Sequence, residues 1–376
     1  MPGEAGEREL MVTAVRLGER GRRSAPPNPW VGCVLARDGE VVGEGFHVRP
    51  GESHAEVVAL AAAGDGARGA TAYVSLEPCA HHGRTASCAD ALVTAGVRRV
   101  IVALDDPDPR VAGEGIARLQ HAGVEVTVGP GAEEAQASLA PYLHHRRTGR
   151  AYCLLKTAMS IDGRTAAADG SSRWITGPDA RADAHRLRAE SQAVVVGAGT
   201  ALADRPTLTA RDVPPPDRQP VRVLLDARGV VPARGPLFDP ALAPTLVVTT
   251  GAATPAAVDE WRAAGAKVEV VERASLGEGV DLAAVLELLG RHGVLQALVE
   301  GGARVHGALL QAGLVDRIVV YVGGTVLGER GAPAFALPGP ESIDGAARWR
   351  LAAVAPVGAD ARLEYEPDEG PPKGRA

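Results

Sequence analysis

Aromatic residues and excess positive charge are both scarce in this chain. Only 3% of its 376 residues are Phe, Trp or Tyr, and 46 acidic against 40 basic residues leave a net charge of -6. A nucleic-acid-binding protein needs a basic surface and often aromatic side chains on which bases stack. We therefore expect no nucleic-acid partner.

Long apolar runs and a disulfide pattern are missing as well. The N-terminal sequence MPGEAGEREL is charged and lacks the apolar core of a signal peptide, and no stretch is long enough to span a bilayer. The chain has only four cysteines, unevenly spaced. In a reducing compartment such cysteines serve metal binding, catalysis or packing. These absences predict a cytoplasmic protein without membrane contact.

Length and the order of secondary-structure signals indicate two α/β domains. A chain of 376 residues exceeds what one hydrophobic core usually supports. Apolar strand-like runs alternate with helical patterns in both halves. We see no internal repeat between the two halves. We expect one domain over residues 1–147, a second over 148–366 and a flexible tail over 367–376, with residues 129–150 joining the two domains.

Local signals place the first elements of the chain. An amphipathic helix is predicted near residues 8–20, followed by a hairpin in which Asp38-Gly39 separates two apolar runs. Further helices are predicted from His54 to Gly64 and from Cys88 to Gly96, each ended by its glycine.

Residues 53–88 carry an ordered set of possible metal ligands. His54, Cys79 and Cys88 would give Zn²⁺ three protein ligands and leave the fourth tetrahedral position for water. Glu56 would hold that water and shuttle its proton. H-x-E followed by P-C-x-x-C is the signature of zinc deaminases, and HAE and PC match it here. The pattern predicts a catalytic zinc; a structural zinc or core packing is the alternative.

The spacing of the two cysteines departs from that signature. Eight residues, AHHGRTAS, replace the two-residue spacer between Cys79 and Cys88. A loop held at both ends by metal ligands must pass close to the substrate, so we expect substrate contacts from His82 and Arg84, and from Asn28 in PNPWVG. Capping or solvation of a turn is the alternative for these three residues. Cys33 and Cys153 lie in apolar runs, which predicts core positions.

Eight motifs together resemble one known family, the bifunctional riboflavin-biosynthesis deaminase-reductases. In order along the chain they are PNPWVGCVL, GEGFH, HAEVVAL, EPCAHHGRTASCADAL, KTAMSIDGRTA, SSRWITG, GAGTALADRPTLTAR and VEGGARVHGALL. The resemblance implies a cytidine-deaminase-like three-layer domain followed by a dihydrofolate-reductase-like α/β domain. It also implies zinc-dependent deamination of a phosphoribosylamino-pyrimidine, and NADPH-dependent reduction of the ribose of the deaminated aminouracil to a ribityl chain. We expect a homo-oligomer.

The second half contains two glycine-rich segments that bear on the cofactor. GAGTAL lacks a small residue at Leu202, so we reject a Rossmann fingerprint there. In VEGGARVHGALL a strand runs into Gly301 and Gly302 and then a helix, which would let backbone N–H groups approach a diphosphate. A structural turn is an equal interpretation of the glycine pair from the sequence alone, and the resemblance favours the cofactor.

The resemblance also assigns contacts by position. Residues that match family contacts to NADPH are Ala158, Trp174, Thr200, Asp204, Gly302, Ala303, Arg304, Val305, His306 and Gly307. Residues expected to contact the substrate are Lys156, Ser172, Arg188, Leu208, Arg211 and Glu300. Arg188 and Arg211 suit a phosphate, and Glu300 suits ribose hydroxyls. For each charged residue taken alone, a surface ion pair is the alternative.

Two positions depart from the family pattern on the cofactor side. Arg205 stands where a second Asp is usual after Asp204, and Ala227 stands where a cofactor-contacting Ser is common after Asp226. They leave open an alternative in which a deaminase carries a degenerate reductase-like module. A nucleic-acid base deaminase is the other alternative, and the acidic balance and the second α/β domain argue against it.

Overall fold

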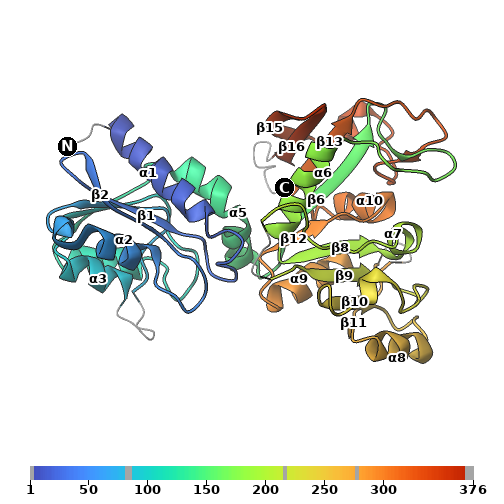
Figure 1. The fold of residues 1–376 in the computed structure, drawn as a ribbon, viewed down its shortest axis with the longest axis horizontal. Coiled ribbons are helices and arrows are strands. Elements are labelled where there is room, and N and C mark those ends of the chain that lie inside the picture. Colours follow the sequence, from blue (N-terminus) through green and yellow to red (C-terminus); the bar gives the residue numbers. More distant parts are fainter. Residues whose placement is uncertain (1–3, 81–86, 215–217, 276–278, 369–376) are drawn as a thin grey trace. The chain divides into compact units, whose positions relative to one another are not determined.

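The computed structural model describes residues 4–80, 87–214, 218–275 and 279–368. The predicted contacts His82 and Arg84 lie outside these residues. The chain divides into two compact units, Met1–Gly149 and Arg150–Ala376 (Figure 1). Among the described residues, no helix combines the length and the apolar character that a bilayer crossing requires.

The first unit is built on a five-stranded sheet in the order β2-β1-β3-β4-β5. Its strands are β1 (Gly32–Arg37), β2 (Glu40–Phe46), β3 (Thr71–Val74), β4 (Arg99–Val102) and β5 (Glu125–Val128). The predicted hairpin is confirmed: β1 and β2 pair antiparallel, and Asp38 and Gly39 between them have φ of 55° and 90°. Strands β3, β4 and β5 are parallel.

Helices cover both faces of this sheet and make three layers, as expected from the sequence. They are α1 (Glu4–Glu19), α2 (Ala55–Ala63), α3 (Cys88–Thr94), α4 (Glu114–His121) and α5 (Ala132–Thr148), with a short 3-10 turn η1 (Gly64–Ala67). Residues of α2, α3 and α4 share one core cluster, which contains Cys33. Residues of α1 and α5 share another on the opposite face. Helix α2 begins next to His54, and α3 begins at Cys88. This layering therefore brings the predicted ligands to one edge of the sheet.

Most of the segment that joins the two halves, residues 129–150, forms the helix α5. It contains Pro141 in its interior and starts after a glycine-rich turn, two features that argue against a helix when the sequence alone is read. Its stability comes from burial of Ala135 and Leu139, the first of them in the cluster formed with α1.

The second unit is built on a nine-stranded sheet in the order β11-β10-β9-β8-β12-β6-β13-β16-β15. The seven strands from β11 to β13 in this order are mutually parallel, whereas β16 pairs antiparallel with both β13 and β15. In chain order they are β6 (Tyr152–Ser160), β8 (Ala193–Gly197), β9 (Val221–Leu225), β10 (Thr245–Thr249), β11 (Lys267–Val270), β12 (Gln296–Val299), β13 (Arg317–Gly323), β15 (Trp349–Val357) and β16 (Asp360–Pro367).

The remaining elements of this unit cover or connect the large sheet. They are the small pair β7 (Arg164–Ala166) and β14 (Ala332–Pro333), the helices α6 (Pro178–Ala189), α7 (Ala198–Asp204), α8 (Pro255–Ala263), α9 (Leu282–Arg291) and α10 (Ala303–Gln311), and the short turns η2 (Pro236–Phe238) and η3 (Ile343–Gly345). Cys153 lies in the core of the sheet, as predicted. The parallel arrangement of β6, β12, β8 and β9 sends their carboxyl ends to one edge, which is where ligands bind in such sheets.

Candidate functional sites

Three side chains of the first unit converge as a possible metal centre. His54 precedes α2, Cys79 lies in the loop after β3, and Cys88 is the first residue of α3. His54 Nδ1 lies 3.6 Å from Cys79 Sγ and 3.3 Å from Cys88 Sγ. The three ligand atoms all lie within 4.8 Å of one another. The structure therefore brings together the three ligands predicted from the sequence.

These distances suit a tetrahedral zinc ion. Bond lengths of about 2.3 Å to sulfur and about 2.0 Å to nitrogen separate the two ligand atoms by about 3.5 Å at a tetrahedral angle. Three protein donors are the number found in catalytic zinc sites, whereas structural sites usually have four. Among the described residues, no fourth His, Cys, Asp or Glu joins this cluster. The donor set thus fits a catalytic zinc.

The two thiols share a proton in this arrangement. A hydrogen bond from Cys88 lowers the pKa of Cys79 to about 4, assisted by His54 against the opposing effect of burial. The same contact, together with burial, raises the pKa of Cys88 well above its ordinary value. One ligand is therefore already a thiolate at neutral pH, and a cation that binds both sulfurs must displace the remaining proton.

Glu56 is a buried carboxyl group beside this centre. It lies in the first turn of α2, and only 3% of its surface is exposed. Burial raises its pKa to about 7, although the charge of His54 opposes this rise. A carboxyl group with a pKa near neutrality can both accept and return a proton. This is the behaviour expected of the predicted proton shuttle.

A hydrogen-bonded chain connects Asn28 to Ser53, the residue before the histidine ligand. Asn28 Nδ2 lies 3.1 Å from His47 Nε2, and His47 Nδ1 lies 3.2 Å from the carbonyl oxygen of Ser53. The rings of His47 and His54 meet edge to face with centroids 5.1 Å apart. Asn28 thus lies close to the centre, and its contact with the substrate stays a prediction; His47 was not singled out from the sequence. Its only sequence signal was its place at the end of the motif GEGFH.

Glu77, two residues before a cysteine ligand, was also missed by the sequence reasoning. Its buried carboxylate accepts hydrogen bonds from four backbone N–H groups at distances of 2.9–3.3 Å, those of Asp106, Gly113, Gly115 and Ile116. Two of these N–H groups belong to the first turn of α4. Glu77 therefore caps a distant helix and holds the segment after β4 against the Pro78-Cys79 backbone.

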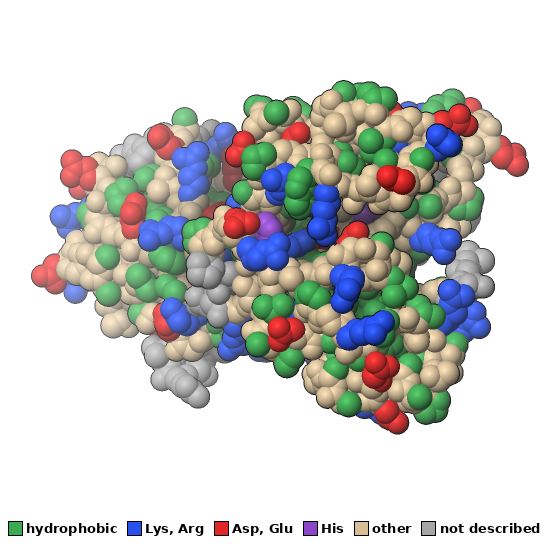
Figure 2. All heavy atoms as spheres, turned by 45° about the vertical axis from the view of Figure 1, so that its right-hand side comes forward, with side chains coloured by type: hydrophobic (Ala, Val, Ile, Leu, Met, Phe, Trp, Pro, Cys, Tyr) green, Lys and Arg blue, Asp and Glu red, His purple; other side chains and the backbone are tan. Residues whose placement is uncertain are grey.

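A cleft of about 1330 Å³ occupies the carboxyl edge of the large sheet in the second unit. Figure 2 turns this unit toward the viewer and shows Lys and Arg side chains gathered among hydrophobic ones around a hollow in its surface. Predicted residues that line the cleft are Lys156, Ala158, Ser172, Trp174, Thr200, Asp204, Glu300, Gly302, Ala303, Arg304, Val305 and His306. Four predicted residues do not line it: Arg188, Leu208, Arg211 and Gly307.

Of the two glycines after β12, Gly301 packs against the backbone at the end of β8, and Gly302 lines the cleft as a backbone cradle before α10. A Cβ at Gly301 would lie 2.7 Å from the backbone N of Gly197, and one at Gly302 would lie 2.9 Å from Thr200 Oγ1. Gly302 has φ of 38° and precedes the first residue of α10. A dinucleotide needs a close approach to backbone N–H groups at a helix N-terminus for its diphosphate. The cradle fits this requirement.

Gly307 has a packing role instead. A Cβ at this position would lie 1.9 Å from the carbonyl oxygen of Ala336, so the glycine allows α10 to pack directly on the segment that follows β14.

A buried ion-pair cluster closes one end of the cleft. Arg188 donates from Nε and Nη2 to the two carboxylate oxygens of Glu300 at 2.6 and 2.9 Å, and Lys156 Nζ lies 3.8 Å from the same carboxylate. Burial favours a raised pKa for Glu300, but the charges of Arg188 and Lys156 outweigh it and lower the pKa to about 2. Burial also lowers the pKa of Lys156, against the attraction of Glu300.

This cluster revises the role expected of Arg188. Its guanidinium binds Glu300 in a bidentate manner and also donates to the carbonyl oxygen of Thr209 at 3.1 Å. It therefore orients the Glu300 side chain rather than lining the cleft itself. Leu208 is buried with φ of 54°, and Arg211 Nη1 donates to Thr207 Oγ1 at 2.6 Å.

The two departures from the family pattern have different surroundings. Arg205 is the C-cap residue of α7 and does not line the cleft. Ala227 does line it, at the carboxyl end of β9. Only the second departure therefore bears on a ligand in this cleft.

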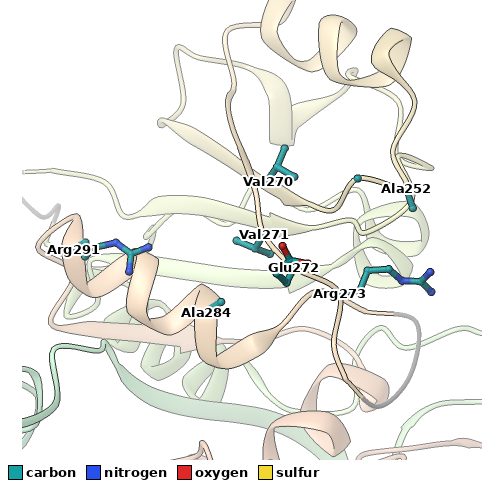
Figure 3. A pocket seen from close by; sticks show the side chains of 8 residues that line it. Ala252, Val270, Val271, Glu272, Arg273, Ala284 and Arg291 are labelled. Carbon is teal, nitrogen blue, oxygen red and sulfur yellow. The ribbon is translucent and has the colours of Figure 1, made fainter.

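A second hollow, of about 720 Å³, lies at the ends of β10 and β11 beside α9. Its charged lining side chains are Glu272, Arg273 and Arg291. Figure 3 shows Arg273 and Arg291 at opposite sides of it, with Glu272 between them. No residue predicted from the sequence lines this hollow, and its arginines do not converge on one point.

Comparisons with known proteins match both units. Residues 151–363 match the family model described as RibD C-terminal domain, and residues 5–104 match that described as cytidine and deoxycytidylate deaminase zinc-binding region. The riboflavin biosynthesis protein RibD of Chlamydia trachomatis is 48% identical over 327 residues, 86% of each chain. That of Escherichia coli is 42% identical over 365 residues, 94% of this chain and 97% of the relative.

Solved structures agree with these relatives. Acinetobacter baumannii RibD superposes with a TM-score of 0.86 at 38% identity, covering 97% of this chain and 99% of the other. A diaminohydroxyphosphoribosylaminopyrimidine deaminase/5-amino-6-(5-phosphoribosylamino)uracil reductase from Thermotoga maritima superposes with a TM-score of 0.84 at 29% identity, with the same coverage.

Proposed function

Because the chain belongs to the RibD family of bifunctional deaminase-reductases of riboflavin biosynthesis, we propose a specific division of labour between its two sites. The first unit deaminates a phosphoribosylamino-pyrimidine at the His54, Cys79 and Cys88 centre. The second reduces the ribose of the resulting aminouracil in the cleft next to Glu300. The alternative of a nucleic-acid base deaminase is set aside with this family membership.

In the deaminase unit, His54, Cys79 and Cys88 hold Zn²⁺, which when bound supplies a Lewis acid that makes a water molecule nucleophilic near neutral pH. Glu56 takes a proton from that water and returns it to the departing amine, so that the ring C–N bond is exchanged for C–O and ammonia leaves. Asn28, held by His47, contacts the pyrimidine edge. His82 and Arg84, outside the described residues, remain proposed contacts for the rest of the substrate.

In the reductase unit, the predicted lining residues hold NADPH, which when bound supplies the hydride. The backbone N–H groups of the cradle at Gly302 would hold the diphosphate of that cofactor. Glu300, oriented by Arg188, accepts hydrogen bonds from ribose hydroxyls, and Lys156 stabilises negative charge that develops on the open-chain carbonyl oxygen. Ser172, which lines the cleft, contacts the remainder of the substrate, and Arg211, which lies outside the lining, would have to leave Thr207 to reach the substrate phosphate.

We place this enzyme in the cytoplasm, because its four cysteines are free. We also expect a homo-oligomer. In support, the outer strand β15 exposes half or more of Leu351 and Val354 at the edge of the large sheet, and an exposed apolar edge strand favours pairing with another chain. Light scattering coupled to size exclusion measures the mass directly.

The observation that carries the proposal is the convergence of the three metal ligands beside the buried Glu56. The test is to incubate the purified protein with the phosphoribosylamino-pyrimidine and NADPH, and to follow ammonia and the absorbance of reduced nicotinamide separately. Both signals should change, ammonia first. Release of ammonia without oxidation of NADPH or NADH, even when the deaminated aminouracil is supplied, would instead favour a degenerate reductase module.

A further inference from the structure

The segment that follows α7 has a strained backbone. Residues 205–212 form neither helix nor strand, and within them Arg205, Leu208 and Asp212 have φ of 44°, 54° and 57°. Residues other than glycine rarely adopt such values, which persist only where surrounding contacts hold the backbone in place. The course of this segment is therefore fixed by its contacts.

The peptide group that joins Thr209 to Ala210 lies inside this segment and is hydrogen-bonded on both sides. Both residues are buried. The carbonyl oxygen of this peptide group, that of Thr209, accepts from Arg188 Nη1 at 3.1 Å. Its N–H group, that of Ala210, donates to Gln219 Oε1 at 2.8 Å. A trans peptide group is planar and rigid. A side chain that holds its N–H therefore also fixes the direction of its carbonyl.

Gln219 makes a second contact with the same residue. Its Nε2 donates to the carbonyl oxygen of Ala210 at 3.1 Å, so one side-chain amide pairs with both backbone groups of Ala210. Only the Asn and Gln side chains carry a donor and an acceptor on one planar amide. Gln219 lies two residues before β9 and does not line the cleft. It therefore ties the strained segment to the start of that strand.

The carbonyl of Thr209 leads through Arg188 to the cleft. Arg188 meets the two carboxylate oxygens of Glu300 with Nε and Nη2, at 2.6 and 2.9 Å, and uses Nη1 for Thr209. Because the guanidinium is planar and rigid, an acceptor at Nη1 helps to fix the plane in which the other two nitrogens meet the carboxylate. His185, one turn earlier on α6, places Nδ1 3.2 Å from the same carbonyl oxygen. The Thr209 oxygen thus anchors the arginine that orients Glu300.

We propose that Gln219 is a positioning residue of the reductase reaction. It holds the peptide group between Thr209 and Ala210, whose carbonyl sets the plane of Arg188. Arg188 in turn aims the carboxylate of Glu300 at the ribose hydroxyls. This assignment rests on the proposed function of the cleft and extends it to an uncharged residue that does not line the cleft.

The test compares two substrates that differ in one hydroxyl group. Reduction of the aminouracil and of its 2-deoxyribose analogue is followed by NADPH oxidation, for the wild type and for Gln219→Met, which keeps the length of the side chain without its polar atoms. With the ribose compound, Gln219→Met should raise KM about tenfold, the effect of losing one or two neutral hydrogen bonds, and leave kcat within about twofold. With the deoxy analogue the rise should be smaller, because one hydroxyl that Glu300 receives is absent.

Two further variants separate positioning from stability. Gln219→Glu keeps an acceptor for the N–H of Ala210 but loses the donor to its carbonyl, so its KM should lie between those of the wild type and Gln219→Met. Gln192→Met is the matched control. Gln192 Oε1 accepts from the backbone N–H groups of Leu295 at 3.2 Å and Gln296 at 3.0 Å, and Gln192 does not line the cleft. Its loss should leave the preference for the ribose compound unchanged. Calorimetric binding of NADPH by each variant reports that the second unit is folded.

Failure of this assignment and failure of the proposed function give different results. If the wild type reduces neither compound with NADPH or NADH, the proposed reductase function fails. The assignment of Gln219 is overturned, while the reductase function stands, if the wild type reduces both compounds equally well or if Gln219→Met leaves KM unchanged. It is also overturned if Gln219→Met raises KM equally for both compounds, or if Gln192→Met reduces the preference for the ribose compound as much as Gln219→Met does.

Discussion

Replacing Glu300 with Gln removes the negative charge that Arg188 and Lys156 share in the second unit. The pKa of Glu300 lies at about 2, against an ordinary value of 4.5. At about 1.36 kcal/mol per pKa unit, this difference corresponds to about 3 kcal/mol of stability. Removal of one partner of a buried ion pair costs a similar amount, about 3–5 kcal/mol, because the other charges stay buried without compensation.

The pH dependence of this loss follows from the direction of the shift. Since the pKa of Glu300 is lower in the folded protein, its stabilising effect is complete above about pH 4.5 and is lost as the pH falls toward 2. The difference in unfolding free energy between wild type and Glu300→Gln should therefore be about 3 kcal/mol at neutral pH and shrink steadily in acid.

Urea denaturation followed by tryptophan fluorescence measures this difference, because the second unit contains the buried Trp261. A loss of about 3 kcal/mol lowers the urea midpoint by about 1 M or more. Glu329→Gln is the matched control, since Glu329 is exposed. Folded Glu300→Gln should also lose NADPH oxidation with the aminouracil while ammonia release continues. Coincident unfolding curves for the wild type and Glu300→Gln at neutral pH, or undiminished reductase activity, would refute the role assigned to this cluster.

Three further predictions concern the first unit. Cys88→Ser should reduce zinc from one ion per chain in metal analysis, because a ligand is lost; full zinc with full deaminase activity would contradict the ligand assignment. Glu56→Gln should keep zinc but slow ammonia release about 10²- to 10⁴-fold, while reduction of supplied aminouracil continues; loss of both activities in folded protein would point to a composite site. Glu77→Ala should destabilise this unit by about 2–3 kcal/mol or more, because four backbone donors lose their acceptor. Fluorescence of the buried Trp30 during urea unfolding measures it, and an unchanged midpoint would count against the capping role.

The sequence alone determined the elements and ligands whose signals are local. The hairpin followed from Asp38-Gly39, because residues that tolerate positive φ are required between paired strands. The ligand set His54, Cys79 and Cys88 followed from residue type and order, because thiolates and imidazole are the donors that zinc prefers. Turn chemistry acts within a few residues, and ligand chemistry shows in residue type and order, so both can be read before the fold is known.

Only the tertiary structure decided which of the charged residues line a cleft and which bind one another. Arg188 and Glu300 are 112 positions apart, and no local pattern predicts that they form a bidentate pair. The buried carboxylate of Asp226 accepts hydrogen bonds from the N–H groups of its own loop, including those of Gly229 and Val231. The helix α5 formed despite Pro141, because packing against α1 outweighs local propensity. A buried polar group must find its partner wherever the chain brings one, and burial itself is a property of the folded chain.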